Sequence, residues 1–103
     1  MKTEFVKIDY EKPLAPQLES AAKILAEGGL VAFPTETVYG LGGNALNADA
    51  AKHIYAAKGR PSDNPLIVHV PSAQDAIPLC HISDASRALM DRFCPGALTL
   101  LMP

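Results

Sequence analysis

The feature that most constrains the fold is the alternation of short apolar runs with stretches of helical periodicity. Four runs, each too short for a helix, are predicted to be strands. They are 5–8, 30–33, 65–70 and 97–102. Three helices are predicted from apolar residues at helical spacing. They are 18–25, 47–58 and 83–94. Strands that alternate with helices predict an α/β fold, with a twisted mixed or parallel sheet and flanking helices.

Local signals predict where these helices begin and end. Gly28-Gly29 supplies a stop for the first helix, and Gly59 supplies one for the second. Asn47 or Asp49 can start the second helix, and Ser83 caps the third. The third helix is expected to turn four residues inward. They are Ala85, Leu89, Met90 and Phe93.

A polar, glycine-rich segment at 35–44 directly follows the buried run 30–33 and is predicted to be a loop. Ligands in open α/β folds sit beyond the carboxyl ends of strands. Thr35, Thr37 and Tyr39 offer hydroxyl groups there, so a binding loop and a plain surface loop are both open readings. The segment matches neither a Walker A loop nor a GxGxxG fingerprint.

A cationic segment follows the second predicted helix and contains Lys58, Arg60 and Asn64. Lysine and arginine both suit a phosphate, so the segment is a candidate site for an anionic ligand. The alternative is helix capping, because cations interact favourably with a helix C-terminus. Capping explains Lys58 fully and Arg60 less well, since Arg60 lies past the expected end of the helix.

His69 stands near the carboxyl end of the run 65–70, where sites gather in α/β folds. A lone histidine in a strand is more often structural than catalytic.

No pair of histidines or cysteines has metal-ligand spacing, so no protein metal site is expected. No Gly-x-Ser-x-Gly motif for a catalytic triad occurs either.

The charge balance limits the classes of partner. The 103 residues carry a formal net charge of −2. That argues against a domain whose main role is to coat nucleic acid. Cys80 and Cys94 are expected to be buried thiols rather than a disulfide. No signal peptide and no apolar run of membrane-spanning length is found, so a cytoplasmic location is expected.

Several of these segments together resemble the YrdC-like threonylcarbamoyl-AMP synthase family. The matching blocks are Gly29 to Gly42, Lys58-Gly59-Arg60-Pro61, Asn64-Pro65-Leu66 with His69, and Pro95 to Thr99. Each motif alone is weak, but their order and spacing make the set specific. The likeness covers the chain from about residue 15 to its end.

The resemblance implies a concave α/β domain that converts L-threonine, bicarbonate and ATP into threonylcarbamoyl-adenylate and pyrophosphate. Mg²⁺ would accompany the ATP, and a partner transferase would then carry the group to tRNA. Lys58 and Arg60 would hold phosphates or stabilise charge, with Asn64 on the nucleotide. The threonine pocket would be lined by Thr35, Thr37 and His69, and shaped by Tyr39.

The family pattern also sets expectations about extent. Residues 1–103 are expected to form one partial domain that continues past 103, because a downstream Ser-x-Asn motif of the family is absent. Cys94 stands where relatives often carry an aromatic residue, and Ala97 where they carry proline. The alternatives are an RNA-binding or carbamoyltransferase-associated domain without synthase activity, or an inactive fragment.

Overall fold

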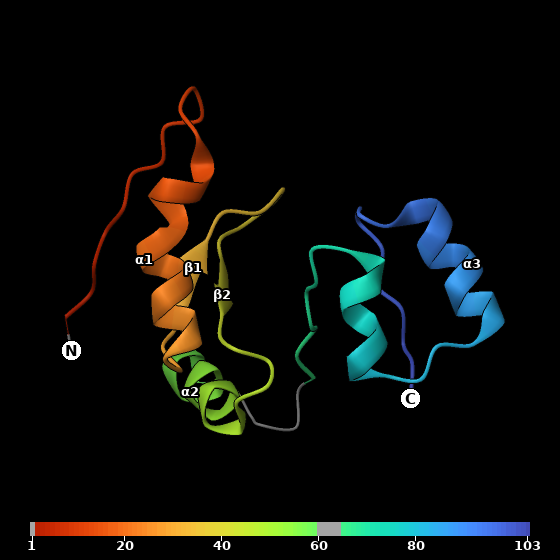
Figure 1. Cartoon of the computed structure of the whole chain (residues 1–103). Helices are drawn as coiled ribbons and strands as arrows, with labels where there is room; N and C mark the ends of the chain where they lie inside the picture. The colour runs from red at the N-terminus through yellow and green to blue at the C-terminus, as the bar shows by residue number, and fades with distance from the viewer. Residues whose placement is uncertain (1, 60–64) are drawn as a thin grey trace. The chain divides into compact units, whose positions relative to one another are not determined.

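A computed structural model describes residues 2–59 and 65–103 of the chain (Figure 1). The chain folds as two compact units, Met1–Pro65 and Leu66–Pro103. In the first unit, helix α1 (Leu14–Ala26) is followed by strands β1 (Val31–Phe33) and β2 (Gly40–Gly42), and then by helix α2 (Ala48–Lys58). The second unit contains the 3₁₀ helix η1 (Ala73–Leu79) and helix α3 (Asp84–Phe93).

Helix α1 ends where the two glycines predict. Gly28 has a φ of +88°, in the left-handed region that favours glycine. Its N–H donates to the carbonyl of Leu25, and the Gly29 N–H donates to the carbonyl of Ile24 at 2.8 Å. These two bonds form a Schellman motif, which satisfies carbonyls that the helix end leaves free. The turn leads the chain directly into β1.

Strands β1 and β2 form an antiparallel hairpin, in which Phe33 pairs with Gly40 and Val31 with Gly42. The Phe33 ring lies across both glycines of β2, since a Cβ built on Gly42 would come within 2.8 Å of the ring. The prediction of a loop throughout 35–44 is therefore wrong at 40–42. Gly-Leu-Gly carries almost no strand signal of its own, because the side chain that packs on it comes from the other strand.

Helix α2 is capped at both ends by residues the sequence singled out. The Asn47 side chain accepts hydrogen bonds from the N–H groups of Asp49 and Ala50, at 3.0 and 3.2 Å. Gly59, with a φ of +64°, forms the C-cap. Inside the helix, Ala50 and Ile54 are buried. The Ile54 Cδ1 and the Leu30 Cδ2 occupy the space next to Gly43 that a Cβ would need. Helix α2 therefore packs against Leu30, just before β1, and against Gly43, just after β2.

Replacing Asn47 with alanine is expected to lower the free energy of unfolding by about 1 kcal/mol, because two N–H groups of α2 lose their acceptor. Chemical denaturation followed by circular dichroism would measure the change. Asn44→Ala is the matched control, since Asn44 accepts from the Leu46 N–H at 2.9 Å but caps no helix. Equal losses from the two variants would contradict the capping role.

In the second unit, α3 begins after Ser83, whose hydroxyl accepts from the Ser86 N–H at 3.2 Å. The expected cap is confirmed. Met90 is buried, and Ala76 of η1 is the other buried apolar residue of this unit's described residues. Leu89 and Phe93 are exposed, at 43% and 50%, and Ala85 is exposed as well. Of the four residues predicted to face inward, only Met90 is buried. The other three stay exposed because no other part of the second unit covers them.

The sheet is smaller than the apolar runs predict. Helices and a sheet are both present, but the sheet among the described residues consists of two antiparallel strands. The runs 5–8, 65–70 and 97–102 have no strand structure there. A strand exists only where a neighbouring backbone completes the hydrogen-bonded ladder. In the described part of the chain, residues 97–103 form one long-range backbone hydrogen bond, which the His81 N–H donates to the carbonyl of Pro103. One bond does not make a ladder.

Candidate functional site

The tip of the β1–β2 hairpin carries three of the predicted site residues. The Thr35 hydroxyl donates to the carbonyl of Val38 and accepts from the N–H of Thr37 at 3.2 Å. One side chain therefore bridges both sides of the turn, in the manner of the hydroxyl turns formed by serine and threonine. The Thr35 side chain shapes the loop, and its oxygen is already engaged.

Thr37 and Tyr39 are presented to solvent at this tip. Tyr39 is 75% exposed, and Thr37 is exposed as well. An exposed phenol and hydroxyl beside an ordered turn can both donate and accept hydrogen bonds. In Figure 1 the tip extends from the strands toward the end opposite α2. The arrangement offers polar groups to a ligand without enclosing one.

Lys58 is the last residue of α2 and is exposed. The left-handed Gly59 ends the helix directly after it, so the ammonium group stands at the negative end of the helix dipole. Arg60 and Asn64, the other two predicted phosphate and nucleotide ligands, lie outside the described residues. Lys58 is thus the one member of this predicted group whose surroundings the structure describes.

His69 belongs to the second unit and is exposed. Its Nδ1 lies 3.0 Å from the carbonyl oxygen of Ile67, two residues earlier. This contact leaves Nε2 of the ring free to meet a ligand. The residues predicted for the threonine pocket are therefore divided between the units, with Thr35, Thr37 and Tyr39 in the first and His69 in the second.

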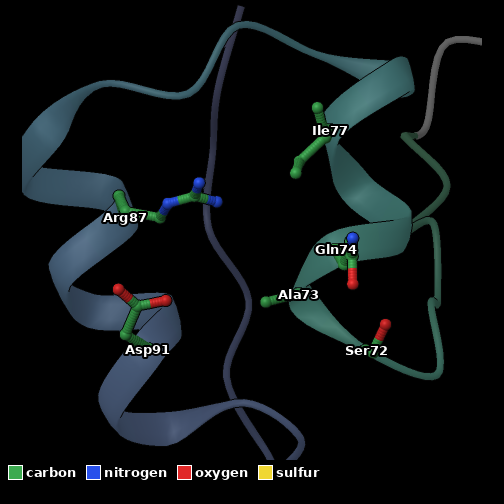
Figure 2. Close-up of a pocket in the computed structure, with 6 residues that line it drawn as sticks. All are labelled: Ser72, Ala73, Gln74, Ile77, Arg87 and Asp91. Atoms are coloured by element: carbon green, nitrogen blue, oxygen red, sulfur yellow. The ribbon is translucent and has the colours of Figure 1, made fainter.

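The second unit also has a hollow between η1 and α3 that the sequence patterns did not single out (Figure 2). Its walls carry Arg87 and Asp91 from α3, facing Gln74 and Ile77 of η1. None of the predicted site residues lines it. A pair of opposite charges four residues apart on a helix is the signal that marks this face, but such pairs are common on ordinary surfaces.

The described residues hold no ready-made metal centre. No three histidine, cysteine, aspartate or glutamate side chains gather among them in a way that could hold a metal ion. None of the helices in the described ranges has both the length and the apolar character to cross a membrane.

Replacing Thr35 with valine is expected to loosen the hairpin tip, because the Thr37 N–H loses its acceptor and Val38 its donor. One neutral hydrogen bond contributes about 1 kcal/mol, so exchange of the Thr37 amide should accelerate about fivefold. Hydrogen exchange followed by NMR measures this. Thr35→Ser keeps the hydroxyl, so its Thr37 amide should exchange at the rate of the unmodified chain. If the Thr37 amide of Thr35→Val also exchanged at that rate, the bridging role would be refuted.

Comparison with known proteins identifies the family. Residues 23–103 match the family model Sua5_yciO_yrdC, described as "Telomere recombination". That match covers most of the chain, and the chain belongs to this family. The resemblance drawn from the motifs is confirmed.

Curated relatives carry a consistent name. A threonylcarbamoyl-AMP synthase of Bacillus subtilis is 52% identical over 107 residues, which span 100% of this chain and 31% of that protein. A synthase of the same name from Pyrococcus abyssi is 52% identical over 88 residues, covering 84% of this chain and 26% of that one. A putative threonylcarbamoyl-AMP synthase of Methanocaldococcus jannaschii is 30% identical over 99% of this chain and 50% of its own length. The chain thus spans a quarter to a half of these relatives.

A solved structure supports the fold. The crystal structure of P. abyssi Sua5 complexed with L-threonine matches with a TM-score of 0.70 at 50% identity. The match covers 78% of this chain and 24% of that one. The expected fold class is confirmed, with mixed helices and a small sheet.

Proposed function

We propose that this chain supplies part of the active site of a threonylcarbamoyl-AMP synthase, a nucleotidyltransferase. The observation that carries the proposal is the match to P. abyssi Sua5 complexed with L-threonine, at 50% identity over 78% of this chain. The names of the B. subtilis and P. abyssi relatives point the same way. The proposed reaction joins L-threonine, bicarbonate and ATP into L-threonylcarbamoyl-adenylate.

The proposed chemistry needs no protein nucleophile. The threonine amine attacks the carbon of bicarbonate and water leaves, which gives a carbamate. A carbamate oxygen then attacks the α-phosphorus of ATP. The bond between the α-phosphorus and the oxygen that bridges the α- and β-phosphates breaks, and pyrophosphate leaves. Alignment of the reactants and stabilisation of the phosphate charge supply most of the catalysis.

The proposed roles divide the polar residues between the two substrates. Lys58 holds the triphosphate and offsets its charge, and it is exposed at the end of α2, where a polyanion can reach it. We assign Arg60 the same role and Asn64 a contact with the nucleotide, on the motif alone. Mg²⁺ enters with the triphosphate rather than in a protein cage, which is how this ion is commonly held at phosphates.

On the threonine side, we propose that the hairpin tip and His69 hold the amino acid. The Thr35 bridge fixes the backbone of the tip, and Thr37 and Tyr39 present hydroxyl groups from it. His69 uses the ring nitrogen that does not face the Ile67 carbonyl. The product would be passed to a partner transferase that modifies tRNA, and we place the reaction in the cytoplasm.

The test replaces the matched 107 residues of the B. subtilis synthase with this chain and follows pyrophosphate release. Release is expected only when ATP, L-threonine and bicarbonate are all present. A folded hybrid that binds tRNA in a salt-sensitive manner but releases no pyrophosphate would instead favour an RNA-binding role. A folded hybrid that does neither would reject the proposed function.

A further inference from the structure

The hairpin tip, residues 34–39, is closed by the last rung of the β1–β2 ladder, in which Phe33 pairs with Gly40. Two residues of the tip, Thr37 and Tyr39, present hydroxyl groups and are exposed. The hydrogen bonds of the Thr35 hydroxyl organise the inside of the turn. The direction in which the whole tip points depends on what holds the closing rung.

The closing rung is held from one side by the ring of Phe33. A Cβ built on Gly40 would lie 3.1 Å from the ring Cε2, and one built on Gly42 would lie 2.8 Å from the ring Cε1. The ring thus covers its direct partner and the diagonal neighbour, a reach that aromatic side chains have across a strand pair. Glycine has no side chain to pack, so side-chain packing on these two positions of β2 depends on the ring.

The packing around Gly40 extends to the base of the tip. The Thr35 Cγ2 lies 3.5 Å from the position that a Cβ on Gly40 would occupy. Phe33 and Thr35 are two residues apart, which places them on the same face of an extended chain. The missing Cβ therefore leaves room for both side chains, and the packing that holds the rung adjoins the residue that shapes the turn.

We propose that Phe33 is a positioning residue of the threonine site. Its ring fixes the rung beside the tip, and the tip then presents the Thr37 and Tyr39 hydroxyl groups in one direction. The ring acts through Gly40 and Gly42 and is assigned no contact with the substrate. This role rests on the proposed function for the identity of the ligand, whereas the packing belongs to the hairpin itself.

The test compares Phe33→Leu with Phe33→Tyr in the hybrid with the B. subtilis synthase. In Phe33→Leu the ring is lost, so the Thr37 amide should exchange about three- to tenfold faster, as expected for the loss of one aromatic cross-strand contact. The KM for L-threonine should rise by a similar factor, with kcat and the dissociation constant of ATP changed less than about twofold. Phe33→Tyr keeps the ring and should show the values of the unmodified hybrid.

Gly42→Ala tests the same contact from the other strand, because its Cβ would displace the ring while Phe33 is kept. It should match Phe33→Leu, and the double variant should be little worse than either, since both substitutions remove one contact. Additive effects, or an unchanged Thr37 exchange rate in Phe33→Leu, would overturn the proposal. An equal loss of ATP and threonine affinity would overturn it too, because general damage to the fold would then explain the result.

Failure of the positioning role and failure of the proposed function give different results. A folded hybrid that releases no pyrophosphate would reject the proposed function. The Thr37 exchange rates of the two single variants and the double variant would then still decide whether the Phe33 ring holds the tip.

Discussion

The Ile54→Ala variant is expected to lose about 2–5 kcal/mol of unfolding free energy. Ile54 is 7% exposed, and only three other apolar residues in the described ranges are buried. Its Cδ1 packs beside Gly43, close to Leu30 and Ala50, so truncation leaves a cavity where α2 meets the hairpin. Denaturant unfolding monitored by circular dichroism would measure the change.

Leu46→Ala is the control for this prediction. It removes an aliphatic side chain that precedes α2 and is 79% exposed, so its effect should stay within about 0.5 kcal/mol. If Ile54→Ala were no more damaging than Leu46→Ala, the packing of α2 on the hairpin would not be what stabilises the first unit. The comparison separates burial from the simple loss of an aliphatic group.

The second large effect is on ligand affinity. In the hybrid with the B. subtilis synthase, Lys58→Ala is expected to weaken ATP binding roughly 10- to 100-fold. A hydrogen bond to a charged group contributes about 1.5–3 kcal/mol, which corresponds to that range. Titration calorimetry with ATP and Mg²⁺ gives the dissociation constant directly, without relying on turnover.

Lys52 provides a matched control on the same helix. Its ammonium lies 3.8 Å from the Asp49 carboxylate, and both side chains are largely exposed. Such a surface pair contributes little to stability, so Lys52→Ala removes the same charge without disturbing α2. Equal losses of affinity in the two variants would mean that ATP responds to overall charge, and the specific role of Lys58 would be rejected.

The family was predictable from the motifs, and the family match confirms that prediction. The individual roles of Thr35, Thr37, Tyr39, Lys58, Arg60, Asn64 and His69 stay predictions. The sequence patterns missed the hydrogen bonds through which Thr35 organises the hairpin tip. They also missed the hollow beside Arg87, because residues from two helices make it and neither helix alone marks it.

Local chemistry by itself determined where α2 and α3 begin and where α1 and α2 end. Asn47 and Ser83 cap helices because their side-chain oxygens reach N–H groups two or three residues along the chain. Gly28 and Gly59 end helices because glycine enters the left-handed region without a steric penalty. These interactions span a few residues, so the sequence contains all the information they need.

Only the tertiary structure decided which apolar residues became strand or core. Strand β2 exists because the Phe33 ring from β1 lies over Gly40 and Gly42. Leu89 and Phe93 have the same helical spacing as Met90 yet stay exposed, since no neighbouring element covers them within the second unit. Pairing and burial depend on residues distant in the chain, and the free energy of burial is gained only where such a partner is present.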